Sequence, residues 1–139
     1  MTAQEQLPRP LALLLDLDNT LYAYDPCHQA ALEAVAEVGV AQGIAGSSAE
    51  FIDVYAQARA DVKSQLGDVA ASHHRLFYFQ RLVERSFKRV SPPLVLKLYQ
   101  LYWDIFIKRM RLDPGVTEAL RFAKERNVGI AVISDMTAD

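Results

Sequence analysis

The chain has 139 residues, 51% of them apolar and 23% charged, and its 15 basic and 17 acidic side chains give a net charge of −2. This composition predicts one globular domain, or a small domain with an insert. It excludes a basic surface for nucleic acid or an anionic membrane, and no apolar run approaches the roughly 18 residues of a spanning helix. With Cys27 as the single cysteine and no secretory signal at the N-terminus, we predict a cytoplasmic protein without disulfides.

The first predicted element is a buried strand over residues 11–15. A short run that is apolar on both faces is typical of a parallel strand. Two carboxylates, Asp16 and Asp18, follow the strand at once, with Asn19 and Thr20 behind them. Ligands of open α/β sheets bind at the carboxyl ends of strands, so these carboxylates lie where chemistry is expected.

Residues 25–112 carry helical signals throughout. Asp25 and Pro26 suit an N-cap and a first helical position, and we predict a first helix over residues 27–38. Ser47 with Glu50 is a capping-box pattern that opens a second helix. Third and fourth helices are predicted from residue 72 to about 90 and after residues 91–93. Four amphipathic helices with short connections indicate a small bundle.

Apolar stripes define the faces that these helices should bury. The second helix has the stripe Phe51, Tyr55, Ala58, Val62 and Leu66. The fourth has the stripe Leu94, Leu98, Leu101, Tyr102, Ile105 and Phe106. We interpret the aromatic residues of the third and fourth helices as core rather than as a substrate pocket. His73 and His74 point about 100° apart on a helix, so we predict a solvated pair and no metal site.

The chain then returns to an α/β pattern. A turn signal at residues 113–115 precedes a helix over residues 116–126 and a buried strand over residues 128–133 that ends at Ser134. If the two strands are neighbours in a right-handed crossover, Ser134 lies beside Asp16. The two carboxylates, this hydroxyl, and the backbone N–H groups and hydroxyl of residues 19 and 20 would then surround one anionic group. A divalent cation is needed there, because a carboxylate and a phosphate repel each other.

At this point the sequence resembles the haloacid dehalogenase superfamily. Residues 13–22 resemble its first motif, an Asp-x-Asp-x-Thr pattern after a hydrophobic strand, and residues 128–134 resemble its second, a strand that ends in Ser or Thr. The resemblance implies an α/β fold: a partial Rossmann-like parallel core of two strands and a crossover helix, with an inserted four-helix cap. Residues 1–24 and 113–139 would form the core, and residues 25–112 the cap.

The resemblance also implies the roles of individual residues. Asp16 would be the nucleophile that forms an aspartyl-phosphate, and Asp18 the general acid and then the base for the hydrolytic water. Mg²⁺ would bind the Asp16 carboxylate and the Asp18 backbone carbonyl. Asn19, Thr20 and Ser134 would bind the phosphate. Dehalogenating members usually lack the second Asp, so Asp18 favours phosphatase activity on a small phosphorylated metabolite.

The later motifs of the family, a lysine and an acidic group, are absent from these 139 residues. Two strands and one helix also leave the faces of a parallel sheet without cover. Three explanations are open: the chain is part of a longer protein, which we favour; a second chain completes the core; or the protein is shortened and held together by dimerisation. We therefore expect weak activity or none from this form. The alternatives are a non-catalytic binding or dimerisation module and a phosphomutase.

Overall fold

The structure is a computed structural model that describes residues 10–134, and these form two compact units. One unit contains the described residues up to Ala23 and those from Arg111 to Ser134, and the other spans Tyr24–Met110. We call them the α/β unit and the helical unit and describe each by itself. Residues 135–139, which the sequence analysis assigned to the core, lie outside the described residues.

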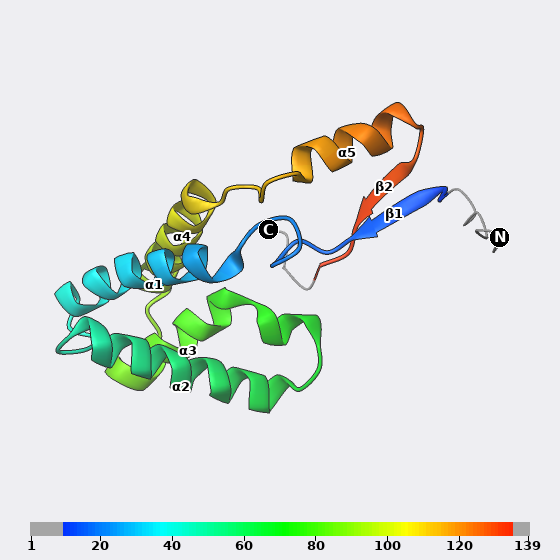
Figure 1. The fold of residues 1–139 in the computed structure, drawn as a ribbon. Coiled ribbons are helices and arrows are strands. Elements are labelled where there is room, and N and C mark those ends of the chain that lie inside the picture. Colours follow the sequence, from blue (N-terminus) through cyan, green and yellow to red (C-terminus); the bar gives the residue numbers. More distant parts are fainter. Residues whose placement is uncertain (1–9, 135–139) are drawn as a thin grey trace, which may run out of the picture. The chain divides into compact units, whose positions relative to one another are not determined.

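Among the described residues, the α/β unit is built from two strands and one helix, which Figure 1 shows. Strand β1 (Ala12–Leu15) pairs in parallel with β2 (Gly129–Val132), with Leu13 opposite Ile130, and α5 (Val116–Glu125) lies between them in the sequence. The predicted parallel core of two strands and a connecting helix is confirmed. Gly115 adopts φ 87° directly before α5, a left-handed turn that glycine makes without a steric penalty.

Much of this two-stranded sheet is exposed within the described residues. The exposed fractions are 67% for Leu14, 42% for Ile130 and 53% for Val132, whereas Ala123 of α5 is buried. Leu13 and Leu15 are half-buried. One crossover helix thus covers only part of the sheet, as expected for a parallel sheet, which normally has helices on both faces.

The helical unit contains four α-helices and a short 3₁₀ helix (Figure 1). They are α1 (Tyr24–Ala41), α2 (Ser48–Leu66), η1 (Ala70–His73), α3 (Arg75–Phe87) and α4 (Pro92–Arg109). Helix α1 packs against α2 and α4, and α3 packs against the same two helices. The largest fully buried side chains of the helical unit are Phe51, Phe79, Leu82, Leu98, Tyr102 and Phe106. None of the described helices is long and apolar enough to span a membrane.

The helix boundaries correct two of the predictions. Helix α1 begins at Tyr24, so Asp25 lies within its first turn, where a carboxylate favours the helix dipole, and is not the N-cap. The third predicted helix is two elements, because His74 adopts an extended conformation between η1 and α3. His74 is half-buried rather than solvated, and its Nδ1 accepts a hydrogen bond from the Leu76 N–H at 3.2 Å.

The predicted N-cap of α2 is confirmed. Ser47 Oγ accepts a hydrogen bond from the Glu50 N–H at 3.2 Å. The reciprocal bond differs from the usual capping box by one residue, because Glu50 Oε2 accepts from the Gly46 N–H at 2.7 Å. Two N–H groups at the start of the helix are nevertheless satisfied, which fixes where α2 begins.

Candidate active site

Asp16 is the first residue after β1, at the carboxyl end of the sheet. The Ile133 N–H donates to the Leu15 carbonyl at 2.8 Å, so the two chains stay paired one residue beyond the strands. Asp16 is exposed, and Ser134 is half-buried. Because Leu15 pairs with Val132, Ser134 follows β2 at the same edge of the sheet from which Asp16 emerges. The parallel register thus brings these two predicted site residues to one edge.

A tight loop follows Asp16, and its backbone N–H groups form hydrogen bonds within the loop. The Leu17 carbonyl accepts from the Thr20 N–H at 3.2 Å and the Leu21 N–H at 2.9 Å, while the Asn19 N–H donates to the Tyr22 carbonyl at 2.9 Å. Asn19 has φ 59°, a left-handed conformation that Asn tolerates better than most residues. The N–H groups of Asn19 and Thr20 therefore close the loop here, and an anion bound there would have to share them.

The two carboxylates have different surroundings. Asp18 is half-buried and accepts a hydrogen bond from Tyr22 Oη. The nearest donor to Asp16 is Thr20 Oγ1, at 3.4 Å from Oδ2, which is long for a hydroxyl–carboxylate hydrogen bond. Asp16 is thus left exposed, while Asp18 is held in place by a neighbouring side chain.

Tyr22 is a member of this site that sequence analysis missed. It is 2% exposed, forms an antiparallel bridge with Leu112, and lies four residues after the carboxylate that it binds. The Asp113 N–H also donates to the Leu21 carbonyl at 2.9 Å, so the returning chain fixes the end of the loop. The only hint in the sequence was that an aromatic residue, Tyr22, ends the motif, although the apolar strand had already ended at Leu15.

A divalent cation would find oxygen donors in this loop. The Asp16 carboxylate and the Asp18 backbone carbonyl are hard ligands of the kind that Mg²⁺ prefers, and Mg²⁺ usually keeps several waters and binds substrate phosphate as well. Among residues 10–134, no group of three or more His, Cys, Asp or Glu side chains is placed to hold a metal. The loop therefore fits Mg²⁺ as part of a ligand set that water or phosphate oxygens would complete.

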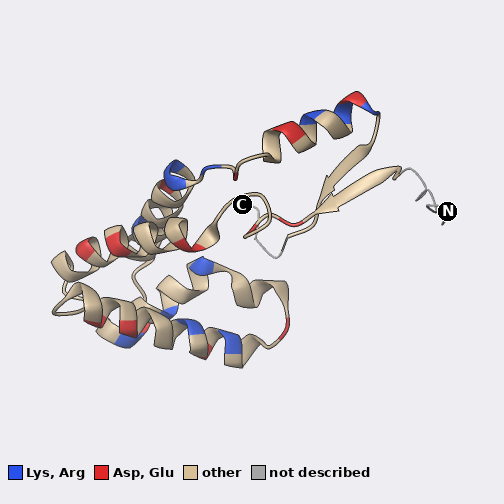
Figure 2. Ribbon diagram, viewed as in Figure 1, with Lys and Arg blue, Asp and Glu red and all other residues tan. Residues whose placement is uncertain are grey.

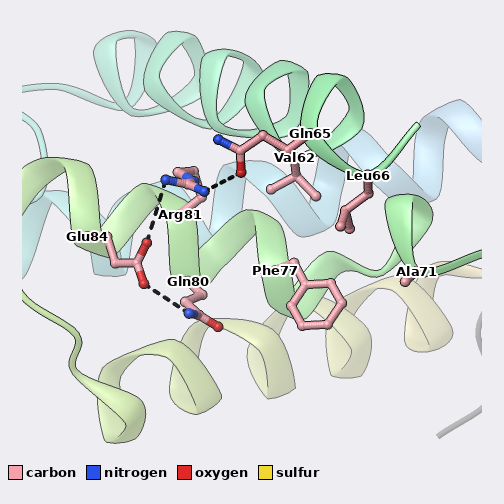
Figure 3. A pocket seen from close by; sticks show the side chains of 8 residues that line it. All are labelled: Val62, Gln65, Leu66, Ala71, Phe77, Gln80, Arg81 and Glu84. Atoms are coloured by element: carbon pink, nitrogen blue, oxygen red, sulfur yellow. Dashed lines mark hydrogen bonds and ion pairs between the residues drawn. The ribbon is translucent and has the colours of Figure 1, made fainter. Parts of the chain in front are cut away.

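The helical unit contains a separate cavity of about 310 Å³ between α2, η1 and α3 (Figure 3). Its polar side chains are already bonded to one another. Arg81 Nη2 donates to Gln65 Oε1 at 2.6 Å, and Gln80 Nε2 donates to Glu84 Oε1 at 2.9 Å. Phe77 lines the same cavity and is 37% exposed, so it is not core as predicted. With its polar groups paired, this cavity is not the candidate site.

Comparisons with known proteins show which hydrolases this chain is similar to. Residues 11–138 match the family described as haloacid dehalogenase-like hydrolase. The chain is 37% identical over 126 residues to a ribulose-1,5-bisphosphate 5-phosphatase of Halopiger xanaduensis. This match covers 91% of the chain and 53% of the relative, so the chain spans about half the length of that protein.

Proposed function

Since the chain belongs to the haloacid dehalogenase-like hydrolases, we propose that it carries the nucleophile half of a phosphatase active site. The reaction is hydrolysis of a small phosphorylated metabolite through an aspartyl-phosphate on Asp16. One observation carries the proposal: an exposed carboxylate at the end of β1 is followed two residues later by a second carboxylate that Tyr22 holds. This pairing suits a nucleophile beside a proton-transfer group.

The chemistry proceeds in two displacements at phosphorus. An Asp16 oxygen bonds to phosphorus as the bond to the leaving oxygen breaks, and protonated Asp18 gives that oxygen its proton. The Asp18 carboxylate then takes a proton from water, whose oxygen attacks phosphorus and releases Asp16. The hydrogen bond from Tyr22 orients Asp18 for both transfers. The same group thus acts as acid and then as base.

Mg²⁺ and the phosphate would bind around the same loop. The Asp16 carboxylate and the Asp18 backbone carbonyl would hold the metal, which neutralises phosphate charge near the nucleophile. The Thr20 hydroxyl, the Ser134 hydroxyl and shared N–H groups of Asn19 and Thr20 would bind the phosphate oxygens. The support for this assignment is that all these groups lie in one loop or at one edge of the sheet.

The name of the relative suggests the substrate class. Because that protein is named as a phosphatase of ribulose-1,5-bisphosphate, we propose a small phosphorylated sugar as the substrate here. The helical unit, inserted between the nucleophile loop and α5, would be the cap. Substrate choice depends on side chains around a site rather than on the fold, so this step needs a direct assay.

Phosphate release from a panel of sugar phosphates and bisphosphates, with Mg²⁺ present, tests the proposal. We expect slow turnover by residues 1–139, because the described residues supply only part of a metal site. The Halopiger relative serves as the positive control. Asp16→Asn should lower turnover more than about a hundredfold, as loss of a nucleophile does. The control is Asp53→Asn, at an exposed acidic residue of α2, which should leave turnover unchanged. Equal turnover by Asp16→Asn and wild type would refute the proposal.

One observation favours a second candidate function, a binding or dimerisation module without catalysis. The exposed apolar residues of β1 and β2 could pair with another chain. In that case Asp16→Asn would leave the function unchanged. A phosphomutase would use the same aspartate, and product analysis distinguishes it, because the phosphoryl group then returns to the substrate rather than to water.

A further inference from the structure

Arg75, the first residue of α3, lies among aromatic rings inside the helical unit. Its Cζ atom is 5.7 Å from the ring centroid of Tyr24, 5.3 Å from that of Tyr102 and 5.3 Å from that of Trp103. Such cation–π contacts are favourable, and more so when water is excluded. They do not, however, remove the charge of the guanidinium, which stays protonated in proteins.

Arg75 has no anionic partner within the described part of the chain. Its Nη2 donates to Tyr24 Oη, and it also hydrogen-bonds Tyr102, but neither partner is a carboxylate. The buried Nε atom has no hydrogen-bond partner among residues 10–134. The charged residues of neighbouring α1 are all acidic (Figure 2), yet none of them forms an ion pair with Arg75.

His28 lies beside the same cluster and adds no negative charge to it. Its Nδ1 lies 2.6 Å from Tyr102 Oη. Burial, followed by the charges of Arg75 and Arg59, lowers the pKa of His28 to about 4, so the ring is neutral at pH 7. A neutral imidazole and two phenols can form hydrogen bonds here, but none of them balances the charge of the guanidinium.

Arg75 is thus a cation with one buried open donor, Nε–H, and no carboxylate partner among residues 10–134. A buried charge without an opposite charge is costly, and so is a buried donor without a partner. An oxyanion would neutralise Arg75 and accept from its open Nε–H, as phosphate and carboxylate groups do with arginine. A metal ion would be repelled, and a neutral apolar group would leave the Nε–H unpaired.

We propose that Arg75, His28 and Tyr102 form a binding site within the helical unit for the phosphate or carboxylate group of a small molecule. The site is argued from contacts within the helical unit alone. It goes beyond the phosphatase proposal, and either can fail while the other stands.

The Nε–H resonance of Arg75, followed by NMR in EDTA at constant ionic strength, tests this site directly. Chloride is replaced stepwise by inorganic phosphate in one series and by acetate in another. We expect a saturable downfield shift as Nε–H gains an acceptor. If only phosphate shifts the resonance, the site binds phosphate groups. If only acetate does, it binds carboxylate groups, and if both do, it binds oxyanions in general. A resonance that neither anion moves would overturn the proposal and leave Arg75 a structural residue.

Variants provide a second, independent readout. The midpoint temperature of thermal unfolding of the wild type should rise with the concentration of the anion that shifts the Nε–H resonance. The affinity derived from this rise should fall about tenfold or more in Arg75→Gln, as for loss of a charged hydrogen bond. Arg85→Gln is the matched control, since Arg85 is on the same helix and already pairs with Asp61. Equal anion affinity in Arg75→Gln and Arg85→Gln would overturn the proposal, and the NMR test does not depend on either variant folding.

Discussion

Asp18 and Tyr22 are joined through their side chains across the loop that follows β1. The phenol is almost fully buried, so the carboxylate is held by a group that itself has little freedom. Precise placement of an acid–base group is a large part of its effect on rate. The proposed roles therefore depend on a residue outside the Asp-x-Asp-x-Thr pattern.

Tyr22→Phe tests this dependence. The ring stays in place, so we expect the variant to fold. Its free energy of unfolding should fall by about 1 kcal/mol, the usual contribution of one buried hydrogen bond. With Asp18 no longer held, kcat should fall about tenfold while KM changes little. Steady-state kinetics and urea unfolding measure the two effects. Tyr99→Phe, on α4 of the helical unit, is the control. An unchanged kcat in Tyr22→Phe would separate this tyrosine from the chemistry.

His28 predicts a loss of stability in mild acid. Burial is the main reason that its pKa falls from 6.5 to about 4, and Arg75 and Arg59 lower it further while Asp25 opposes them. As pH falls below 6.5, the unfolded chain binds a proton at this residue and the folded chain does not until about pH 4. The free energy of unfolding should therefore decrease across this interval.

Urea unfolding at pH 7 and pH 4.5 measures this effect. We expect the wild type to lose about 2 kcal/mol more than His28→Gln between the two pH values, from about 1.4 kcal/mol per unit of pKa shift with allowance for partial exposure. The histidines at positions 73 and 74 are present in both proteins, so their contribution cancels. Parallel pH profiles for the two proteins would show that His28 is not held neutral by the fold.

At the scale of elements, α1 and α2 approach each other closely at one glycine. Gly39 of α1 is buried against Phe51 of α2, and a Cβ atom at Gly39 would lie 2.1 Å from Phe51 Cε2. No side chain fits at Gly39 unless the Phe51 ring moves. Gly39 lies beyond the helix predicted over residues 27–38, but in the structure it is a helical residue that lets two helices approach.

Gly39→Ala should therefore destabilise the protein although alanine is the better helix former. The clash with Phe51 costs about 1–3 kcal/mol, against a gain in helix propensity of about 1 kcal/mol. Urea unfolding should show a net loss, and the loss caused by Gly39→Ala should be smaller in a Phe51→Leu background, because leucine can move aside. A Gly39→Ala variant more stable than the wild type would contradict this packing.

The periodicity of the sequence predicted the elements better than their ends. On α2, Phe51, Tyr55, Ala58 and Val62 are buried as expected, but Leu66 is 40% exposed because it is the last residue of the helix. On α4 the buried stripe begins at Val95 rather than Leu94. An apolar stripe indicates which face of a helix is buried on average. The end of a helix depends instead on individual contacts, such as the hydrogen bond to His74 at the start of α3, which the spacing of apolar residues does not reveal.

The candidate site was predictable to the extent that it lies in one short segment. Asp16, Asp18 and Ser134 follow apolar strands, and the parallel register brings the strand ends together. Tyr22 and the donor cluster around Arg75 were not predictable, since they depend on pairs such as His28 and Tyr102, which are 74 residues apart. Long-range pairs of polar side chains leave no periodic signal in a sequence.

At the scale of the whole molecule, the open sheet of the α/β unit predicts self-association. Among residues 10–134, Leu14, Ile130 and Val132 expose apolar surface, and the outer edges of β1 and β2 are unpaired, which favours pairing with another chain. Light scattering on residues 1–139 should give a mass above that of one chain. Leu14→Lys should lower it, whereas Leu66→Lys in the helical unit should not. A monomer at all concentrations would contradict this expectation.

The central claim is that Asp16 forms a covalent bond to phosphorus, and a single-turnover trap tests it most directly. With para-nitrophenyl phosphate the leaving group needs no acid, so Asp18→Asn should allow phosphorylation but slow the hydrolysis that needs a base. Acid quenching, digestion and mass spectrometry then locate the phosphoryl group. The account predicts it on Asp16 in Asp18→Asn and on no residue in the double variant Asp16→Asn/Asp18→Asn. A phosphoryl group on another residue, or none in Asp18→Asn, would contradict it.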